Sequence, residues 1–284
     1  VDLARAALGQ RIGPRLDLAL SAVRAAALSP AGREPPLQLA RGRVERAVGS
    51  PDSALAAFQA YLAVGGDSGL GLLELARTHY FAHQPAAGLR AYYMGARAST
   101  APAAALYRSD LAWIATPAEL AAFDTLPSGP ARATWLAEFW QRRDVAEARE
   151  PGERLAEHYR RWFYAERNFL LVSRHRHYDI TERYRSGQGE FDDRGAIYLR
   201  HGSPDRRATY VSSEVIEPNE TWLYHQAQGD LIFHFVARKG VQDFKLVESL
   251  ADALASGLGA ALALQTERGM SAAPVTARRR PWPR

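Results

Sequence analysis

The sequence predicts an α+β fold: an array of α-helical repeats, followed by a small α+β domain with a three- to four-stranded antiparallel sheet. Residues of similar size recur every 34 positions in the first part of the chain, which is typical of stacked helical hairpins. After Arg174 the chain changes to short β-branched and aromatic runs bounded by glycine, proline and asparagine, which is typical of antiparallel strands. Apolar residues make up 47% of the chain, enough to build a core in each part.

Small and aromatic residues carry the period. Gly42, Ala76 and Asp110 are 34 residues apart, and so are Phe58 and Tyr92. Small residues suit positions where two helices approach closely, and an aromatic ring can fill the space beside them. We therefore expect one helical hairpin per period, with each hairpin stacked on its neighbours.

This pattern resembles the tetratricopeptide repeat, a helical hairpin of about 34 residues. The match covers about residues 36–102, lacks the usual tryptophan of that repeat, and has weaker units on both sides, with a further hairpin or cap at about 2–29. The expected domains are a tetratricopeptide-like array at 1–105, an α+β domain at 106–266, and a basic tail at 267–284. Within the second domain we expect helices in 116–172, strands in 196–248 and a C-terminal helix at 249–266.

Helices are expected to open the second domain. Thr116 with Glu119 three residues later forms a capping box, and Pro117 suits a first helical turn. Two further helices, at about 130–143 and 151–172, carry aromatic residues at helical spacing that are expected to form core.

Three short runs predict the sheet. They are AIYLRHG (196–202), ETWLYHQ (220–226) and DLIFHFVARKG (230–240), with QDFKLVES (242–249) as a candidate fourth strand. Successive side chains of a strand alternate between its faces. In the second run Glu220, Trp222 and Tyr224 are therefore expected to share one face.

The stretch GEFDDRGAIYLRHGSPD (189–205) is similar to the signature of the GWxTD domain family, G-W-x-T-D-R-G followed by a strand and a G-x-P-D turn. EFWQRRD (138–144) and ETWLYH (220–225) match further elements of that family, and order and spacing agree over about 110–248. The resemblance implies a fold, with no established biochemical activity. The matched positions, expected to be structural, are Trp140, Asp144, Gly189, Asp193, Arg194, Gly195, Gly202, Pro204, Asp205, Glu220, Trp222 and Tyr224.

The chain departs from that signature at Glu190, where the family has tryptophan, and at Asp192, where it has threonine. Carboxylates and glycines beside Arg194 suit hydrogen-bonded turns. Arg194 is expected to form a buried bidentate ion pair with Glu220 across neighbouring strands.

An enzyme or a metal site is the alternative interpretation of the same region. Asp193, Asp205 and Glu220 would then act as acid, base or cation ligands. Asp192 is disfavoured as a partner of Asp193 on one ion, because neighbours on an extended segment point to opposite faces.

Composition and motifs exclude several other classes. The absence of cysteine excludes disulfides, thiolate metal sites and a cysteine nucleophile. No G-x-S-x-G, phosphate-binding glycine loop or H-E-x-x-H occurs, so no cofactor is expected. His175 and His177 could share one side of a strand, joined by Asp179 or Glu182, but no third histidine is near and no metal is expected.

Charge and hydropathy limit the partners. The net charge of +5 comes from arginines that mostly alternate with acidic residues, which is typical of solvated helix faces rather than of a nucleic-acid-binding surface. No apolar run reaches the ~20 residues of a membrane span. The chain begins at Val1, so we expect an earlier segment to have been removed, and fold-level analogy with small outer-membrane assembly lipoproteins weakly favours the bacterial envelope or exterior.

The repeats favour an interaction function. Stacked hairpins present extended surfaces to peptides, helices or neighbouring subunits. The candidate contact residues are Tyr80, Phe81, Tyr92, Tyr93 and Met94, and packing between hairpins explains each of them equally well. We expect a non-enzymatic scaffold that binds a protein partner or assembles with itself into a homo-oligomer or filament.

Overall fold

The computed structural model of the chain describes residues 17–127, 129–171, 190–211, 216–237 and 243–250. The chain divides into two compact units, and the boundary between Arg160 and Arg161 lies inside helix α9 (Glu153–Phe169). The predicted domain boundary at residue 105 falls within the first unit, inside helix α6 (Ala101–Leu111). The predicted fold class is confirmed, because a helical array precedes a four-stranded antiparallel sheet.

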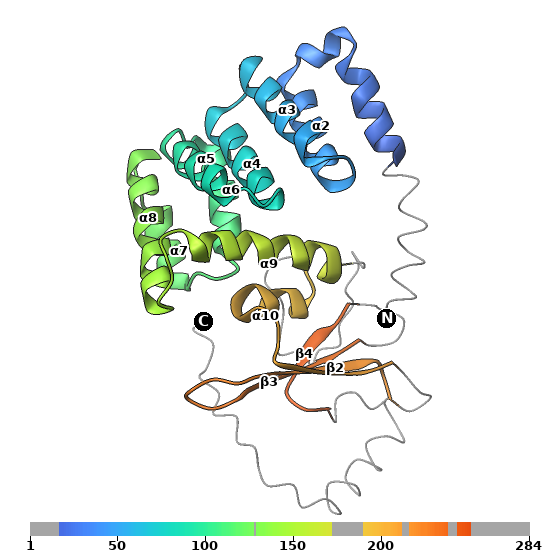
Figure 1. Cartoon of the computed structure of the whole chain (residues 1–284), viewed down its shortest axis with the longest axis vertical. Coiled ribbons are helices and arrows are strands. Elements are labelled where there is room, and N and C mark those ends of the chain that lie inside the picture. Colours follow the sequence, from blue (N-terminus) through green and yellow to red (C-terminus); the bar gives the residue numbers. More distant parts are fainter. Residues whose placement is uncertain (1–16, 128, 172–189, 212–215, 238–242, 251–284) are drawn as a thin grey trace, which may run out of the picture. The chain divides into compact units, whose positions relative to one another are not determined.

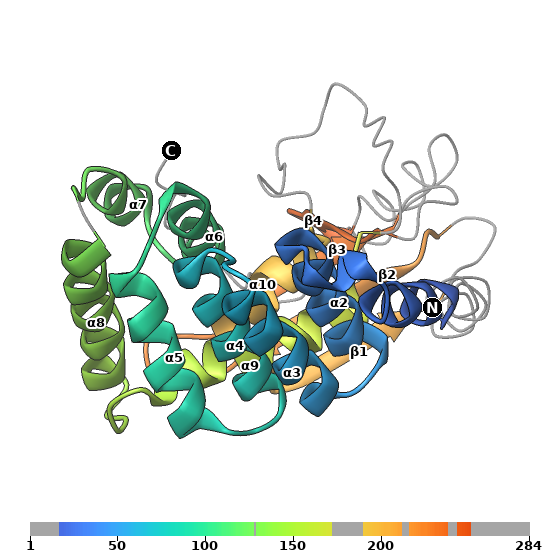
Figure 2. The ribbon, with the colours of Figure 1, turned by 90° about the horizontal axis from the view of Figure 1, so that it is seen from above.

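The first unit is a series of helical hairpins (Figures 1 and 2). Residues 17–27 are helical, and the elements that follow up to α6 are η1 (Pro30–Arg33), α2 (Pro35–Val48), α3 (Pro51–Ala63), α4 (Ser68–Phe81) and α5 (Pro85–Arg97). Proline stands in the first turn of α2, α3, α5 and α6, where its missing N–H costs no helical hydrogen bond. Corresponding helices start 34 residues apart in α3 and α5, at Pro51 and Pro85.

Close approach of the helices explains the small residues of the period. A Cβ atom added to Gly42 would lie 2.4 Å from the ring of Phe58, and one added to Gly88 would lie 2.9 Å from the ring of Tyr80. Glycine is therefore required where an aromatic side chain of the neighbouring helix packs directly on the backbone.

Three further helices follow α6 in the chain: α7 (Pro117–Asp124), α8 (Gly129–Ala146) and α9. The predicted capping box is confirmed, because Thr116 and Glu119 each accept from the other's backbone N–H at the start of α7. Phe139 and Trp140 of α8 and Tyr159 of α9 are buried, as the aromatic stripes predict.

The second unit contains α10 (Asp193–His201) and an antiparallel sheet in the order β1-β2-β3-β4. Its strands are β1 (Arg206–Tyr210), β2 (Asn219–Tyr224), β3 (Leu231–Val236) and β4 (Lys245–Val247). Helix α10 lies beside the sheet (Figure 1). The face of β2 that carries Glu220, Trp222 and Tyr224 is buried, whereas the residues between them are half-buried, so the predicted alternation is confirmed.

The prediction of a strand at 196–202 is wrong, because residues 196–201 belong to α10 and Gly202 is its C-terminal cap. Asp192 starts the helix by accepting from the N–H groups of Arg194 and Gly195, and Gly202 ends it at φ 80°. Ile197, Tyr198 and Leu199 are all buried, so a short apolar run carries neither a helical nor a strand period. The predicted helix at 249–266 and the tail lie outside the described residues, apart from 249 and 250.

Candidate functional site

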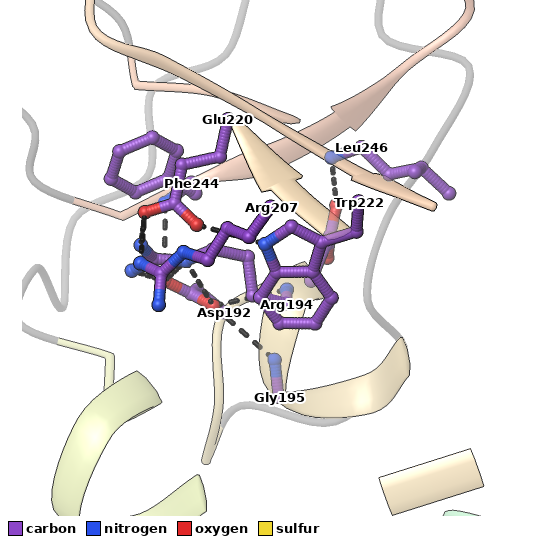
Figure 3. Close-up of polar contacts among 9 residues, drawn as sticks. Asp192, Arg194, Gly195, Arg207, Glu220, Trp222, Phe244 and Leu246 are labelled. Atoms are coloured by element: carbon purple, nitrogen blue, oxygen red, sulfur yellow. Dashed lines mark hydrogen bonds and ion pairs between the residues drawn. The ribbon is translucent and has the colours of Figure 1, made fainter. Parts of the chain in front are cut away.

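The polar centre of the second unit is Arg194, which is 0% exposed (Figure 3). Its guanidinium donates to Asp192 through Nε, at 3.1 Å to Oδ2, and through Nη2, at 2.6 Å to the same oxygen. Nη1 donates to Oε1 of Glu220 at 2.8 Å. The rings of Phe244 and Phe169 lie 3.7 Å and 5.2 Å from the guanidinium carbon and enclose the charge.

The predicted pairing of Arg194 with Glu220 is therefore confirmed, but its predicted geometry is wrong. Arg194 lies on helix α10 rather than on a strand, and the carboxylate that accepts from two of its nitrogens, Nε and Nη2, is that of Asp192. An arginine with a carboxylate at each end of its fork joins the start of α10 to β2.

Asp192 and Asp193 have different partners. Besides capping α10, Asp192 accepts from the N–H of Phe244 at 3.3 Å. Asp193 accepts from the N–H of Leu246 in β4 at 2.9 Å. The aspartate pair thus ties the first turn of the helix to β4 and to the residue before it.

Glu220 is held ionised by its neighbours. Oε1 also accepts from Nη2 of Arg207 at 2.7 Å, and Oε2 accepts from Nε1 of Trp222 at 3.0 Å (Figure 3). Burial by itself raises the pKa of Glu220, but the charges and hydrogen bonds of Arg194 and Arg207 outweigh it, so the pKa lies below its usual value. A general acid at neutral pH needs the opposite shift.

The C-terminal end of α10 is held by hydrogen bonds from the side chains of Arg161 and Tyr224. The guanidinium of Arg161 donates to the carbonyls of Leu199 at 3.3 Å and Arg200 at 2.8 Å, the acceptors that the last helical turn leaves free. Tyr224 of β2 donates through its hydroxyl to the carbonyl of Gly202 at 2.9 Å. A Cβ at Gly202 would lie 3.0 Å from Nη2 of Arg161.

Two further signature positions lie in the first unit and pack its helices. Nε1 of Trp140 donates to the hydroxyl of Tyr92 at 3.1 Å. Asp144 accepts from the N–H groups of Gly152 at 2.8 Å and Arg154 at 2.7 Å, so it caps the start of α9 from the preceding helix.

The proposed acid–base set is not assembled. Asp193 and Glu220 lie with Asp192 and Arg194 where the start of α10 meets β2 and β4, and we call these four residues the Arg194 cluster. The exposed Asp205 instead accepts from the N–H of His225, beyond the far end of β2. Within the described part of the chain, no group of three or more histidine, aspartate or glutamate side chains is placed to hold a metal ion. Gly189 and the residues near His175 and His177 lie outside the described residues, and Pro204 is half-buried after α10.

The candidate contact residues divide by burial. Tyr80 and Tyr92 lie in the core of the first unit, where each ring packs near that of Tyr159, so neither offers a contact surface. Phe81 and Tyr93 are half-buried. Met94 is 57% exposed. Of the adjacent pair on α5, Tyr92 is fully buried and Tyr93 is half-buried, with its ring 5.4 Å from that of Tyr92.

Sequence reasoning missed a series of buried acids in the repeats. Glu45 and Glu74 are 0% exposed and Asp110 is 1% exposed. Each accepts from an arginine on a preceding helix: Arg24 binds Glu45, Arg43 and Arg46 bind Glu74, and Arg77 binds Asp110. We call this series the arginine–acid ladder.

The ladder follows the period of the repeats. Arg43 and Arg77 occupy equivalent positions 34 residues apart, and each reaches an acid in the next helix of the same kind, from α2 to α4 and from α4 to α6. The separation of Arg43 and Arg77 by one 34-residue period was the sequence signal that could have revealed the ladder.

None of the described helices combines the length and apolarity that crossing a membrane requires. Comparison of the chain with protein-family models, with curated proteins and with solved structures found no match.

Proposed function

We propose that the protein is a non-enzymatic scaffold that binds a protein partner or further copies of itself through its helical array. The observation that carries this proposal is the array itself, in which successive hairpins are joined by the arginine–acid ladder. Stacked hairpins of this kind expose long rows of side chains without needing a pocket.

A stripe on α5 is the surface that suits a partner best. Arg90, Tyr93, Met94 and Arg97 follow one another at helical i, i+3, i+4 and i+7 spacing, and all but the half-buried Tyr93 are exposed. We call these four residues the α5 stripe. A tyrosine and a methionine between two arginines have the composition that protein interfaces favour.

The Arg194 cluster supports an architectural role for the second unit. Its carboxylates accept hydrogen bonds that join α10, β2 and β4, and the pKa of Glu220 is lowered rather than raised. We propose that residues 110–248 form a GWxTD-like domain whose matched positions are structural. The enzyme alternative is weakened because Asp205 is remote from the other two carboxylates.

A negative charge introduced into the α5 stripe tests the scaffold proposal. Met94→Glu is expected to lower the particle mass measured by light scattering at high protein concentration, or to abolish capture of a partner from the source cells. Gln59→Glu is the matched control, because Gln59 is exposed on α3 one period before Tyr93. If wild type and both variants show one mass and capture the same proteins, the proposal is wrong.

A further inference from the structure

Among the residues that the structure describes, the first strand of the sheet lies at its edge. In the order β1-β2-β3-β4, β1 pairs with β2 on one side, and all five of its residues are exposed. Pairing with β2 is continuous from Arg206 to Tyr210, and the exposed stretch continues into Val211, which is 65% exposed. An edge strand of this kind presents a row of backbone N–H and C=O groups to any further strand.

We propose that β1 pairs antiparallel with β1 of a second copy of this chain, around a two-fold axis at Ala208. This inference deepens the proposed self-assembly by naming one partner and one contact, and it involves the sheet unit rather than the α5 stripe. Two sheets joined in this way would form one continuous sheet of eight strands, by a contact that uses the same surface on both copies.

In this register, each side chain of β1 lies opposite a side chain of the second copy that it can pack against. With Ala208 opposite Ala208 of the second copy, Arg206 stands opposite Tyr210 of the second copy and Arg207 stands opposite Thr209. Arginine over a tyrosine ring is a favourable pair, and no two like charges face each other directly. The pair of Arg206 with Tyr210 forms twice around the two-fold axis, once from each copy, and this favours a second copy over an unrelated strand.

Other registers fit less well. Moving the axis to Arg207 would place two guanidinium groups directly opposite each other, which destabilises a strand pair. Moving the axis to Thr209 would leave Arg206 without a partner inside β1.

Because the chain has no cysteine, single cysteine variants test this register directly. Residues directly opposite in an antiparallel pair have Cα atoms about 4.5–5.5 Å apart, within the range that a disulfide spans. Under mild oxidation, Ala208→Cys is expected to form a covalent dimer at least about tenfold faster than Arg206→Cys, because pairing raises the effective concentration of the thiols. In Arg206→Cys, the two thiols would lie about 13 Å apart along the strand, from four residues at 3.3 Å each.

A mixed sample provides the second readout. Arg206→Cys and Tyr210→Cys are expected to crosslink poorly alone and readily when mixed, because only the mixture places the two thiols opposite each other. Ala208 is exposed, so its variant is expected to keep the wild-type circular dichroism spectrum. Equal crosslinking rates for Ala208→Cys and Arg206→Cys would overturn the proposal. If the rates are equal and Met94→Glu still lowers the mass in solution, the scaffold function stands without the edge pairing.

Discussion

Arg194 and Glu220 are joined by a 2.8 Å hydrogen bond between buried atoms, although 26 residues separate them in the chain. The first lies in the opening turn of α10 and the second on β2, so this single contact joins the helix to the sheet. Asp192 occupies the other side of the arginine fork. A buried cation between two buried carboxylates is costly to disturb from any side, because each change leaves a charge without its partner.

Replacing Arg194 is therefore expected to destabilise the second unit strongly. Arg194→Ala should lower the free energy of unfolding by about 3–5 kcal/mol, because it removes the buried positive charge that Asp192 and Glu220 share. Arg194→Lys should give an intermediate loss, since an ammonium group cannot serve both sides of the fork. Chemical unfolding followed by circular dichroism measures both variants.

Arg207→Ala is the matched control for that series. Arg207 binds the same oxygen of Glu220, but its side chain is 42% exposed, so its removal should cost far less. Wild-type stability in Arg194→Ala, or losses of equal size in both alanine variants, would contradict a structural role for the cluster.

A substitution at Gly202 tests the other end of α10. The backbone there has φ 80° and ψ −152°, a region that residues with a Cβ atom rarely adopt, and a Cβ would lie 3.0 Å from the guanidinium of Arg161. Gly202→Ala is expected to destabilise by at least about 1–3 kcal/mol, the usual cost of such backbone strain. Differential scanning calorimetry provides the measurement.

A control variant at Gly229 separates the effect of backbone strain from that of the contact with Arg161. Gly229 has φ 120°, and nothing lies within 4 Å of the position that a Cβ would occupy. Gly229→Ala should therefore show backbone strain alone and a smaller loss than Gly202→Ala. A larger loss at Gly229 would mean that the contact with Arg161 contributes little.

The part of the fold that sequence predicted best is the part with local causes. The 34-residue period was visible because Gly42 must be small for Phe58 to pack against it, and the same kind of pair recurs one period later as Ala76 and Tyr92. The capping box at Thr116 lies within four consecutive residues and was predicted for the same reason.

Features that depend on distant neighbours were missed. Helix α10 is flanked by a cap at Asp192 and a terminating Gly202, and both signals were present, but its apolar run is buried on most sides and carries no clear period. Strand β1 is polar and exposed, and its pairing with β2 defines it. The arginines of the repeats were interpreted as solvated, because the burial of Glu74 depends on the stacking of the next hairpin.

The arginine–acid ladder predicts how the repeats respond to acid. Burial raises the pKa of Glu74, but the charges of Arg46, Arg77 and Arg43 overcome this effect and lower it from 4.5 to about 2. A carboxylate with a lowered pKa stabilises the folded state above its unfolded pKa, and this contribution is lost as the pH falls through the folded value. For Glu74 the loss is expected between about pH 4.5 and pH 2.

Comparison with Glu74→Gln isolates this contribution. The unfolding free energies of wild type and variant should differ most near neutral pH, and the difference should shrink by about 3 kcal/mol as the pH falls toward 2. Glu119→Gln is the control, because Glu119 also has a lowered pKa but its side chain is 23% exposed. A wild-type-minus-variant difference at Glu74 that stays constant with pH would contradict the charged pairing.

Asp144 caps a helix other than its own, and replacing it tests how much this contact stabilises the start of α9. It lies on α8, is buried, and accepts from two backbone N–H groups at the start of α9. Asp144→Ala removes the acceptor of two donors, the buried N–H of Arg154 and the half-buried N–H of Gly152, so the loss should exceed the ~1 kcal/mol of an ordinary capping residue. Asp144→Asn should lose less, because its amide oxygen can still accept one of the two hydrogen bonds.

Thr116→Ala calibrates the size of that effect. Thr116 caps α7 within its own turn and is exposed, so water can replace its side chain when it is removed. Hydrogen exchange should therefore show faster exchange at Gly152 and Arg154 in Asp144→Ala, together with a larger fall in unfolding free energy than in Thr116→Ala. Equal losses in the two variants would mean that Asp144 acts as an ordinary surface cap, and that the start of α9 is held by its apolar packing instead.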